Sequence, residues 1–151
     1  MKCLSVSQPF ADLIISGKKT VELRNWNTNF RGEFLIHAPI KIRLDECKRL
    51  KITKKLAVGV IIGKATLYDV KKYNSLKEIK KDQKFHFASK NFRDKTFGFI
   101  IKNAKPLRVP IPLKGKLGLF DVELSKGLNK NKDILMDIID EEYRYQWIGH
   151  H

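Results

Sequence analysis

The sequence has few cysteines and no cluster of metal ligands. Cys3 and Cys47 are its only cysteines and do not form a CxxC pair, and two of its four histidines are the terminal His150 and His151. Isolated thiols are typical of proteins in a reducing compartment, and zinc sites require closely spaced ligand pairs. We therefore expect a cytoplasmic protein without disulfides, without a metal site and without a cofactor.

Long apolar runs are also scarce. The apolar run from Leu56 to Gly63 is far shorter than the ~20 residues that a membrane-spanning helix needs. Near the N-terminus, Gln8, Pro9 and Asp12 interrupt the apolar stretch that a signal peptide would require. The sequence therefore predicts no membrane association, and its 151 residues correspond to about one domain.

Acidic residues are few compared with basic ones. The chain has 16 Asp and Glu against 31 Lys and Arg, which gives a formal net charge of +15. Residues 1–132 contain 30 of the basic residues and 11 of the acids, whereas residues 133–151 contain one Arg and five acids. Such an excess favours polyanionic partners, and RNA, DNA and anionic lipid are the candidates.

Two segments concentrate the positive charge. Their spacing permits two interpretations, a well-hydrated surface of the kind reported for heat-adapted proteins or a surface that contacts successive phosphates. Both segments together, in so basic a chain, favour phosphate contacts. The first segment contains Lys41, Arg43, Lys48, Arg49, Lys51, Lys54 and Lys55, and the second contains Lys71, Lys72, Lys77, Lys80, Lys81 and Lys84.

Hydrophobic spacing predicts an α+β fold. The spacing after Pro9 indicates a short helix that ends near Gly17, and the basic residues 41–51 indicate a surface helix. Alternating or β-branched residues predict strands over 20–24, 33–37, 55–70, 96–101 and 117–124. Glycines within 55–70 indicate strongly bent strands, as in a small β-barrel with peripheral helices.

The end of the chain differs from the rest in pattern and in charge. Apolar residues recur at helical spacing over residues 131–147, which predicts an additional C-terminal amphipathic helix. We therefore divide the chain into a body, residues 1–126, and a C-terminal helical extension, residues 127–151, packed on the same domain.

One short segment has residues suited to binding chemistry. Residues 17–24 read Gly-Lys-Lys-Thr-Val-Glu-Leu-Arg. In a strand, Glu22 and Arg24 share one face about 6–7 Å apart, and Lys19 can join them from the preceding turn. Such a trio could bind an anionic or amide-bearing ligand through carboxylate and guanidinium hydrogen bonds. The alternative is an exposed Glu–Arg ion pair that contributes about 0–1 kcal/mol.

The same segment resembles the opening of an ASCH domain. That family's G-x-K-x-x-E-x-R signature is matched by Gly17, Lys19, Glu22 and Arg24, and the similarity extends over about residues 3–123. The resemblance implies a PUA-like β-barrel with a cleft lined by the signature residues, and a role in RNA metabolism. Further matching segments are Ser5 to Ala11, Trp26 to Thr28, Arg31-Gly32, Leu35 to Ala38, Phe97 to Phe99, Pro110 to Pro112, Lys114-Gly115 and Leu117 to Phe120.

The resemblance also implies enzymatic alternatives. Some small family members remove the acetyl group from N4-acetylcytidine, and a ribonuclease activity has been ascribed to others. In the amidohydrolase subgroup the signature lysine is catalytic, a threonine occupies the position of Glu22, and a later glutamate, for which Glu78 is the candidate here, completes the site. If the protein is an enzyme, Lys19 and Glu22 are the expected catalytic residues.

Three functions follow from these observations. The first is an RNA-binding module that contacts RNA or a nucleotide through Lys19, Glu22, Arg24, Trp26, Thr28 and Arg31. The second is a hydrolase of modified nucleosides or a ribonuclease. The third is an adaptor that binds a protein through the C-terminal helix. Trp26 could stack on a base or pack in the core, His37 is expected to be structural, and Ser5 and Ser7 lack the partners of a serine nucleophile.

Overall fold

The computed structural model describes residues 1–89, 95–123 and 145–146. Its main element is a six-stranded mixed sheet with the strand order β2-β6-β5-β3-β1-β7. Neighbouring strands are antiparallel except for the parallel pair β1 and β3. The strands are β1 (Lys2–Ser5), β2 (Val21–Arg24), β3 (Gly32–Ala38), β5 (Val60–Tyr73), β6 (Thr96–Pro112) and β7 (Leu119–Asp121).

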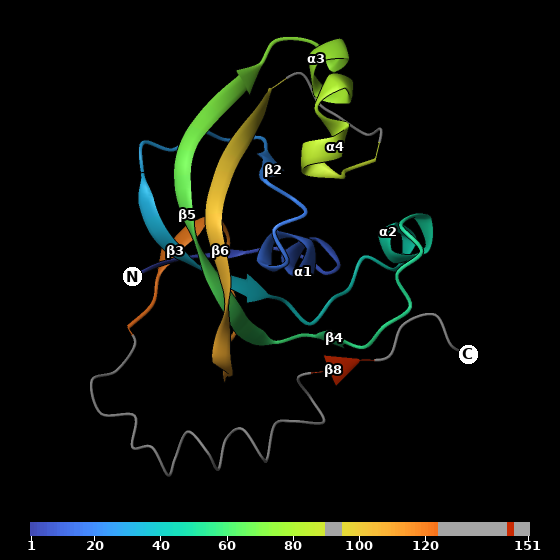
Figure 1. Ribbon diagram of the computed structural model, residues 1–151. Helices are drawn as coiled ribbons and strands as arrows, with labels where there is room; N and C mark the ends of the chain where they lie inside the picture. The colour runs from blue at the N-terminus through green and yellow to red at the C-terminus, as the bar shows by residue number, and fades with distance from the viewer. Residues whose placement is uncertain (90–94, 124–144, 147–151) are drawn as a thin grey trace.

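The long strands β5 and β6 are strongly bent (Figure 1), and the glycines within residues 55–70 predicted this bend for β5. Their pairing contains three register shifts, and such bulges increase the local twist and curvature of a strand. Gly63 permits a close approach at the bend, since a Cβ there would lie 2.3 Å from Ile15 Cδ1 and 2.5 Å from the Lys105 carbonyl oxygen. The Pro-rich part of β6 remains extended, as predicted.

Two apolar clusters lie on opposite faces of the sheet. Alternation along β3 directs Phe34 and Ile36 to one face, where they pack with Ile14 of helix α1 (Phe10–Ile15). Leu35 faces the other side, where the end of β6 covers the smaller cluster. The alternation within one strand therefore supplies both layers of the core.

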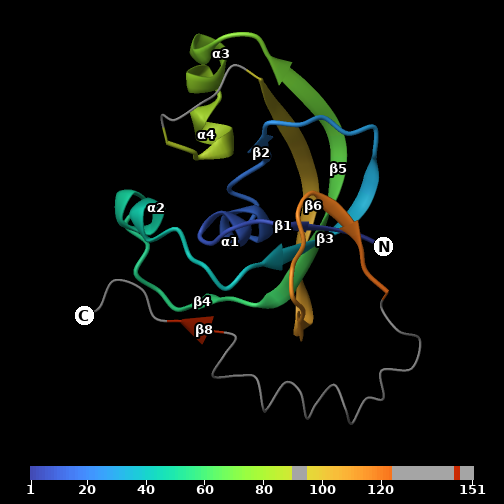
Figure 2. The same ribbon diagram turned by 180° about the vertical axis from the view of Figure 1, so that it is seen from behind.

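The helices gather on one side of the sheet (Figures 1 and 2). They are α1, α2 (Leu44–Arg49), α3 (Leu76–Lys81) and α4 (Gln83–His86). Helix α2 lies within the predicted helix 41–51, whereas α3 and α4 occupy the second basic segment. No helix among the described ranges is both long enough and apolar enough to cross a bilayer.

The prediction of a closed barrel is wrong. Strands β2 and β7 form the two edges of the sheet and do not pair with each other. Arg24 of β2 instead donates a hydrogen bond from Nη2 to the Ser5 carbonyl oxygen of β1, at 2.7 Å. A side chain thus connects β2 with β1, two strands that share no backbone ladder. The fold is an open mixed sheet with a few helices.

The predicted C-terminal helix is wrong at Tyr145–Gln146. These residues form strand β8, which pairs antiparallel with β4 (Leu56–Ala57) in a separate two-stranded sheet. The remainder of the predicted helix, 131–144 and residue 147, lies outside the described residues. The division of the chain at residue 126 stays a prediction.

Candidate functional site

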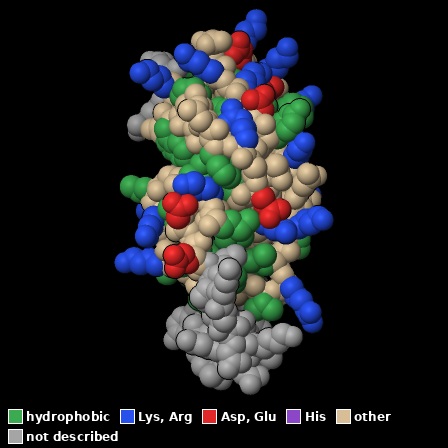
Figure 3. Space-filling model, turned by 90° about the vertical axis from the view of Figure 1, so that its left-hand side faces the viewer, with side chains coloured by type: hydrophobic (Ala, Val, Ile, Leu, Met, Phe, Trp, Pro, Cys, Tyr) green, Lys and Arg blue, Asp and Glu red, His purple; other side chains and the backbone are tan. Residues whose placement is uncertain are grey.

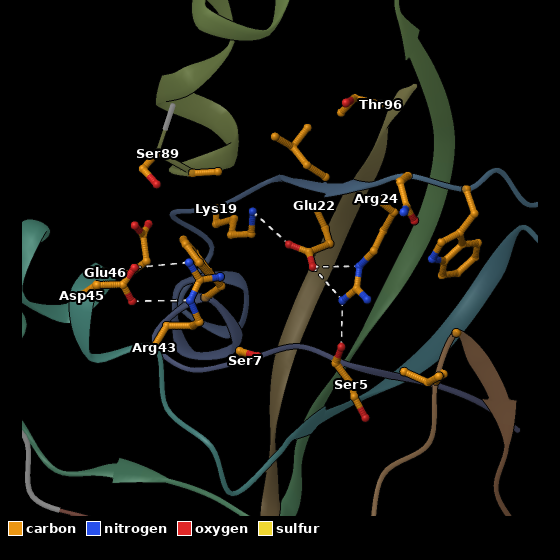
Figure 4. A pocket seen from close by; sticks show the side chains of 17 residues that line it. Ser5, Ser7, Lys19, Glu22, Arg24, Arg43, Asp45, Glu46, Ser89 and Thr96 are labelled. Carbon is orange, nitrogen blue, oxygen red and sulfur yellow. Dashed lines mark hydrogen bonds and ion pairs between the residues drawn. The ribbon is translucent and has the colours of Figure 1, made fainter. Parts of the chain in front are cut away.

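Lys19, Glu22 and Arg24 meet at one point, as the strand geometry predicts (Figure 4). Lys19 Nζ lies 3.1 Å from Glu22 Oε1, and Arg24 Nη2 lies 2.7 Å from Glu22 Oε2. The Nε atom of Arg24 also donates to Glu22 Oε2, at 3.0 Å. One carboxylate therefore accepts from both cations, and the pair is not the fully exposed ion pair of the alternative interpretation.

A turn after α1 brings Lys19 to this point. Gly17 adopts a φ of 83°, a left-handed conformation that glycine accepts without steric cost. The chain then reverses, and the backbone N–H of Lys19 donates to the Leu13 carbonyl at 2.9 Å. Lys19 enters the site from the turn while Glu22 and Arg24 enter from β2, which explains why residues of different strand parity converge.

The Lys19 side chain is almost fully buried, with 2% of its surface exposed. Its ammonium nitrogen donates to the carbonyl oxygens of Val21 at 2.6 Å and His86 at 2.5 Å, in addition to its contact with Glu22. Burial lowers the pKa of this amine, and the neighbouring Glu22 carboxylate opposes that shift. Three acceptor oxygens surround the nitrogen, whereas a neutral amine would have only two N–H groups to offer them. The geometry therefore favours the charged form.

Glu22 remains ionised despite its burial. Burial alone would raise the pKa of this carboxyl, but Lys19 and Arg24 together hold the pKa below its ordinary value. The trio, of which Lys19 and Glu22 are buried and Arg24 is partly exposed, carries a net charge of one positive unit.

The trio lines one wall of a pocket with a volume of about 890 Å³, within the range of small-molecule sites. Its walls come from β2, from the segment between β1 and α1, from α2, from the segment after α4, and from the turn before β7. The lining residues are Ser5, Ser7, Phe10, Lys19, Glu22, Leu23, Arg24, Asn25, Trp26, Arg43, Asp45, Glu46, Ala88, Ser89, Thr96, Leu117 and Gly118.

The charges that line the pocket are balanced by ion pairs. Lys19 and Arg24 pair with Glu22, and Arg43 Nη2 lies 3.3 Å from Asp45 Oδ2. Glu46 is buried and pairs with Arg49 at 2.6 Å, and Arg49 also donates to the Phe87 carbonyl at the end of α4. In the described part of the chain, each lining Lys or Arg therefore has a carboxylate partner, in contrast to the basic excess of the whole molecule.

Trp26 lies at the pocket and also packs against the core. Its ring is edge-on to Phe99, with 5.1 Å between centroids and 85° between planes. The two interpretations from the sequence are thus compatible, because the ring can pack against the core and still line the pocket.

Two predicted contact residues, Thr28 and Arg31, do not line this pocket. They belong to the turn between β2 and β3, where Thr28 Oγ1 accepts from the Phe30 backbone N–H. Arg31 donates to the Thr28 and Phe30 carbonyls and lies 3.6 Å from Asp69 Oδ1. They shape the turn, and a role in RNA contact stays a prediction.

His37 and Glu78 have structural contacts. His37 is buried, and its Nε2 lies 2.6 Å from the Leu113 carbonyl, so Nε2 carries the proton and Nδ1 accepts from the Ser5 hydroxyl. Burial also lowers the pKa of His37. The Glu78 carboxylate accepts a hydrogen bond from the Asn74 backbone N–H at the start of α3, and Glu78 is not among the pocket residues.

Most of the pocket wall was not predicted from the sequence, since only Lys19, Glu22, Arg24 and Trp26 among its lining residues were expected to bind a ligand. Arg43, Asp45 and Glu46 come from α2 and the residue before it, and Leu117 comes from the turn before β7. The two consecutive acids Asp45 and Glu46 interrupt the first basic segment, and that interruption was the available signal. Within the ranges that the structure describes, no three His, Cys, Asp or Glu residues are grouped as metal ligands.

Comparison with known sequences finds relatives that are much longer than this chain. It is 32% identical over 143 residues to human activating signal cointegrator 1 and 30% identical to the mouse protein. These matches cover 85% of the chain but 24% of each relative. The chain thus spans about a quarter of the length of these curated relatives.

Comparison with solved structures identifies the same fold. The crystal structure of ASCH from Zymomonas mobilis has a TM-score of 0.60 and 16% identity, covering 98% of this chain and 97% of that one. A point variant of the Zymomonas mobilis protein gives a TM-score of 0.60, 18% identity and coverage of 92% and 96%. The ASCH domain model matches residues 4–126, and the chain therefore belongs to the ASCH domain family.

Proposed function

We propose that this protein binds single-stranded RNA, with one nucleobase in the pocket and the phosphates on the basic surfaces beside it. The observation that carries the proposal is the contrast in charge between the two places. Each described cation in the pocket lining has a carboxylate partner, whereas most lysines of the two basic segments are exposed. A base is uncharged and polar, and a phosphate is anionic, so the two parts of a nucleotide suit different surfaces.

A phosphate is poorly matched to the pocket. It would have to compete with Glu22 and Asp45 for the cations that these carboxylates already bind, and it would be repelled by Glu46. A base has N–H donors for carboxylate oxygens and carbonyl acceptors for a guanidinium. It can therefore form hydrogen bonds with the carboxylates and guanidinium groups of the pocket without bringing in a net charge.

The basic segments lie on two sides of the pocket. Helix α2, which supplies Asp45 and Glu46, belongs to the first segment, and α3 and α4 belong to the second. Figure 4 shows that α2 and α4 approach the site from different directions. An RNA strand that crosses the pocket can therefore contact lysines through the phosphates before and after the base that enters the pocket.

Trp26→Ala tests whether a base enters the pocket. Base–aromatic stacking is worth about 1–3 kcal/mol, so we expect at least about fivefold weaker binding to a fluorescent single-stranded RNA. The dependence of affinity on salt should not change, because every phosphate contact is retained. Fluorescence anisotropy at several salt concentrations measures both quantities.

Phe99→Leu is the matched control, because Phe99 packs against Trp26 but does not line the pocket. We expect this variant to lose stability and to retain its affinity at a temperature where it is folded. Equal losses of affinity in both variants, or no loss in Trp26→Ala, would contradict base binding in the pocket.

The geometry of Lys19 favours binding over amide hydrolysis. A nucleophilic or basic lysine needs a free lone pair, but this nitrogen has three acceptor oxygens around it. We therefore expect no cytidine when the protein is incubated with N4-acetylcytidine, and no shortening of the bound RNA. Chromatography and gel electrophoresis measure the products; cytidine release that disappears in Lys19→Met would establish the hydrolase instead.

A further inference from the structure

Tyr68 is an exposed aromatic residue on the side of the sheet away from the pocket. It follows Leu67, which packs in the core with α1, and it sits at the register shift between Leu67 and Asp69. Its ring contacts the ammonium of Lys102, which follows the buried Ile101 on β6, so Tyr68 lies on the face opposite to that cluster. Its surface is 59% exposed. An aromatic ring of this exposure is available to a partner.

Lysines occupy the strand positions on one side of Tyr68. The ammonium of Lys102 lies 4.0 Å from the centroid of the Tyr68 ring, and Lys102 is paired with Thr66 across β5 and β6. Lys64 of β5 and Lys105 of β6 form a further pair along the same two strands, beyond Thr66 and Lys102 as seen from Tyr68. We call Tyr68, Lys64, Lys102 and Lys105 the Tyr68 face.

The cations of this face are only partly neutralised. Lys64 Nζ lies 3.7 Å from Glu33 Oε1 on the neighbouring strand β3, a long and exposed contact. Lys102 and Lys105 have no carboxylate partner among the residues that the structure describes. Figure 3 views the molecule from the side of β3 and β5 and shows Lys and Arg side chains projecting along both margins. The face is therefore positive beside an exposed ring.

We propose that the Tyr68 face is a second binding surface for single-stranded RNA, separate from the pocket. A base stacks on Tyr68, and Lys102 and Lys105 contact successive phosphates on one side of it. Stacking on an aromatic ring within a positively charged groove is how proteins hold single strands without sequence preference. A single strand fits better than a duplex, whose bases are stacked on each other. This proposal goes beyond the function assigned to the pocket and does not depend on it.

Tyr68→Ala tests the stacking contact through the affinity, and Lys102→Ala tests the phosphate contact through the salt dependence of the affinity. The probe is a labelled oligouridylate of about 30 nucleotides, longer than the roughly 4–16 nucleotides that one such domain covers. Tyr68→Ala should bind at least about fivefold more weakly with an unchanged salt slope, and Tyr68→Phe should restore the affinity. Lys102→Ala should lower the log–log salt slope by about 0.7, because it removes one phosphate interaction.

Lys2→Ala is the charge-matched control, since Lys2 lies on β1 beside β7 and is paired with Asp121. It should leave the affinity and the slope unchanged. Wild-type affinity in Tyr68→Ala would overturn the proposal, even if Trp26→Ala still weakens binding and the pocket assignment stands. Loss of binding to phosphatidylserine vesicles in Tyr68→Ala, with RNA binding intact, would overturn it in favour of a lipid surface.

Discussion

Replacing Glu22 by glutamine is expected to lower the free energy of unfolding by about 3–5 kcal/mol, the cost of removing one partner from a buried ion pair. The substitution leaves the Lys19 ammonium buried without a counter-charge, and it replaces one of the two acceptor oxygens by an NH2 donor that must face Lys19 or Arg24. Shape and volume are conserved, so the loss reports charge rather than packing. Urea unfolding monitored by circular dichroism measures it.

Glu33→Gln provides the matched control. The same change is made on strand β3, at an exposed ion pair with Lys64 whose nitrogen and oxygen are 3.7 Å apart. We expect a change within about 1 kcal/mol. If both variants lost similarly little unfolding free energy, the trio would contribute no more to stability than an exposed Glu–Arg ion pair. That was the alternative interpretation of the sequence.

The pH dependence of the Glu22 effect has a defined sign. The pKa of this carboxyl is lower in the folded protein than in the unfolded chain, where it is about 4.3. Its contribution to stability is therefore complete above the unfolded pKa and is lost as the pH falls through the folded pKa. The difference in unfolding free energy between the wild type and Glu22→Gln should narrow below about pH 4; a constant difference down to the acid transition would contradict this.

Removal of the lysines on α3 and α4 is the second change with a large expected effect. These side chains are exposed, and the segment that follows α4 lines the pocket, so their removal should affect RNA binding without unfolding the protein. If two of about five phosphate contacts are removed, the salt slope falls by about 1.4 and the affinity at 0.15 M salt falls about tenfold. The variant replaces Lys77, Lys80, Lys81 and Lys84 by alanine.

A control variant separates the effect of where positive charge is removed from the effect of how much is removed. Lys2→Ala, at the far edge of the sheet, removes positive charge without touching the basic segments, and we expect it to leave the slope within about 0.2 of the wild type. If each lysine removed from α3 and α4 changed RNA binding only as much as Lys2→Ala does, the affinity would depend on the net charge of the protein and not on where that charge lies. That result would contradict phosphate contacts at these helices.

The core of the site could be predicted because its residues are close in sequence. Glu22 and Arg24 are two positions apart on one strand, and alternation alone puts them on the same face. Lys19 could be placed from the glycine turn before the strand. Its burial could not be predicted, since it depends on the His86 carbonyl, which lies far along the chain.

The fold shows the same limit. The bend of β5 was predictable because Gly63 marks it in the sequence, and the extended end of β6 was predictable from its prolines. Whether the sheet closes depends on contacts between β2 and β7, which lie at opposite ends of the described sheet, and no local pattern reports them. The C-terminal helix was predicted from periodicity alone, and the pairing of β8 with β4 overrode that pattern at residues 145–146.

The pocket wall from α2 was missed for a physical reason. Asp45 and Glu46 lie in a basic segment, where acids are expected to be simple surface ion pairs. Glu46 is buried because α2 packs against the end of α4 through Arg49, a contact between distant parts of the chain. The net charge of the segment was visible in the sequence, but the sign of the charge that faces the pocket was not.

The salt dependence of RNA binding tests the central claim most directly. The affinity for a single-stranded RNA is measured by anisotropy from about 50 to 200 mM salt. With about five phosphates neutralised by the exposed lysines and an uncharged base in the pocket, log Kd plotted against log salt should have a slope of about 3.5. A slope near zero, or no detectable complex at the lowest salt, would contradict the account.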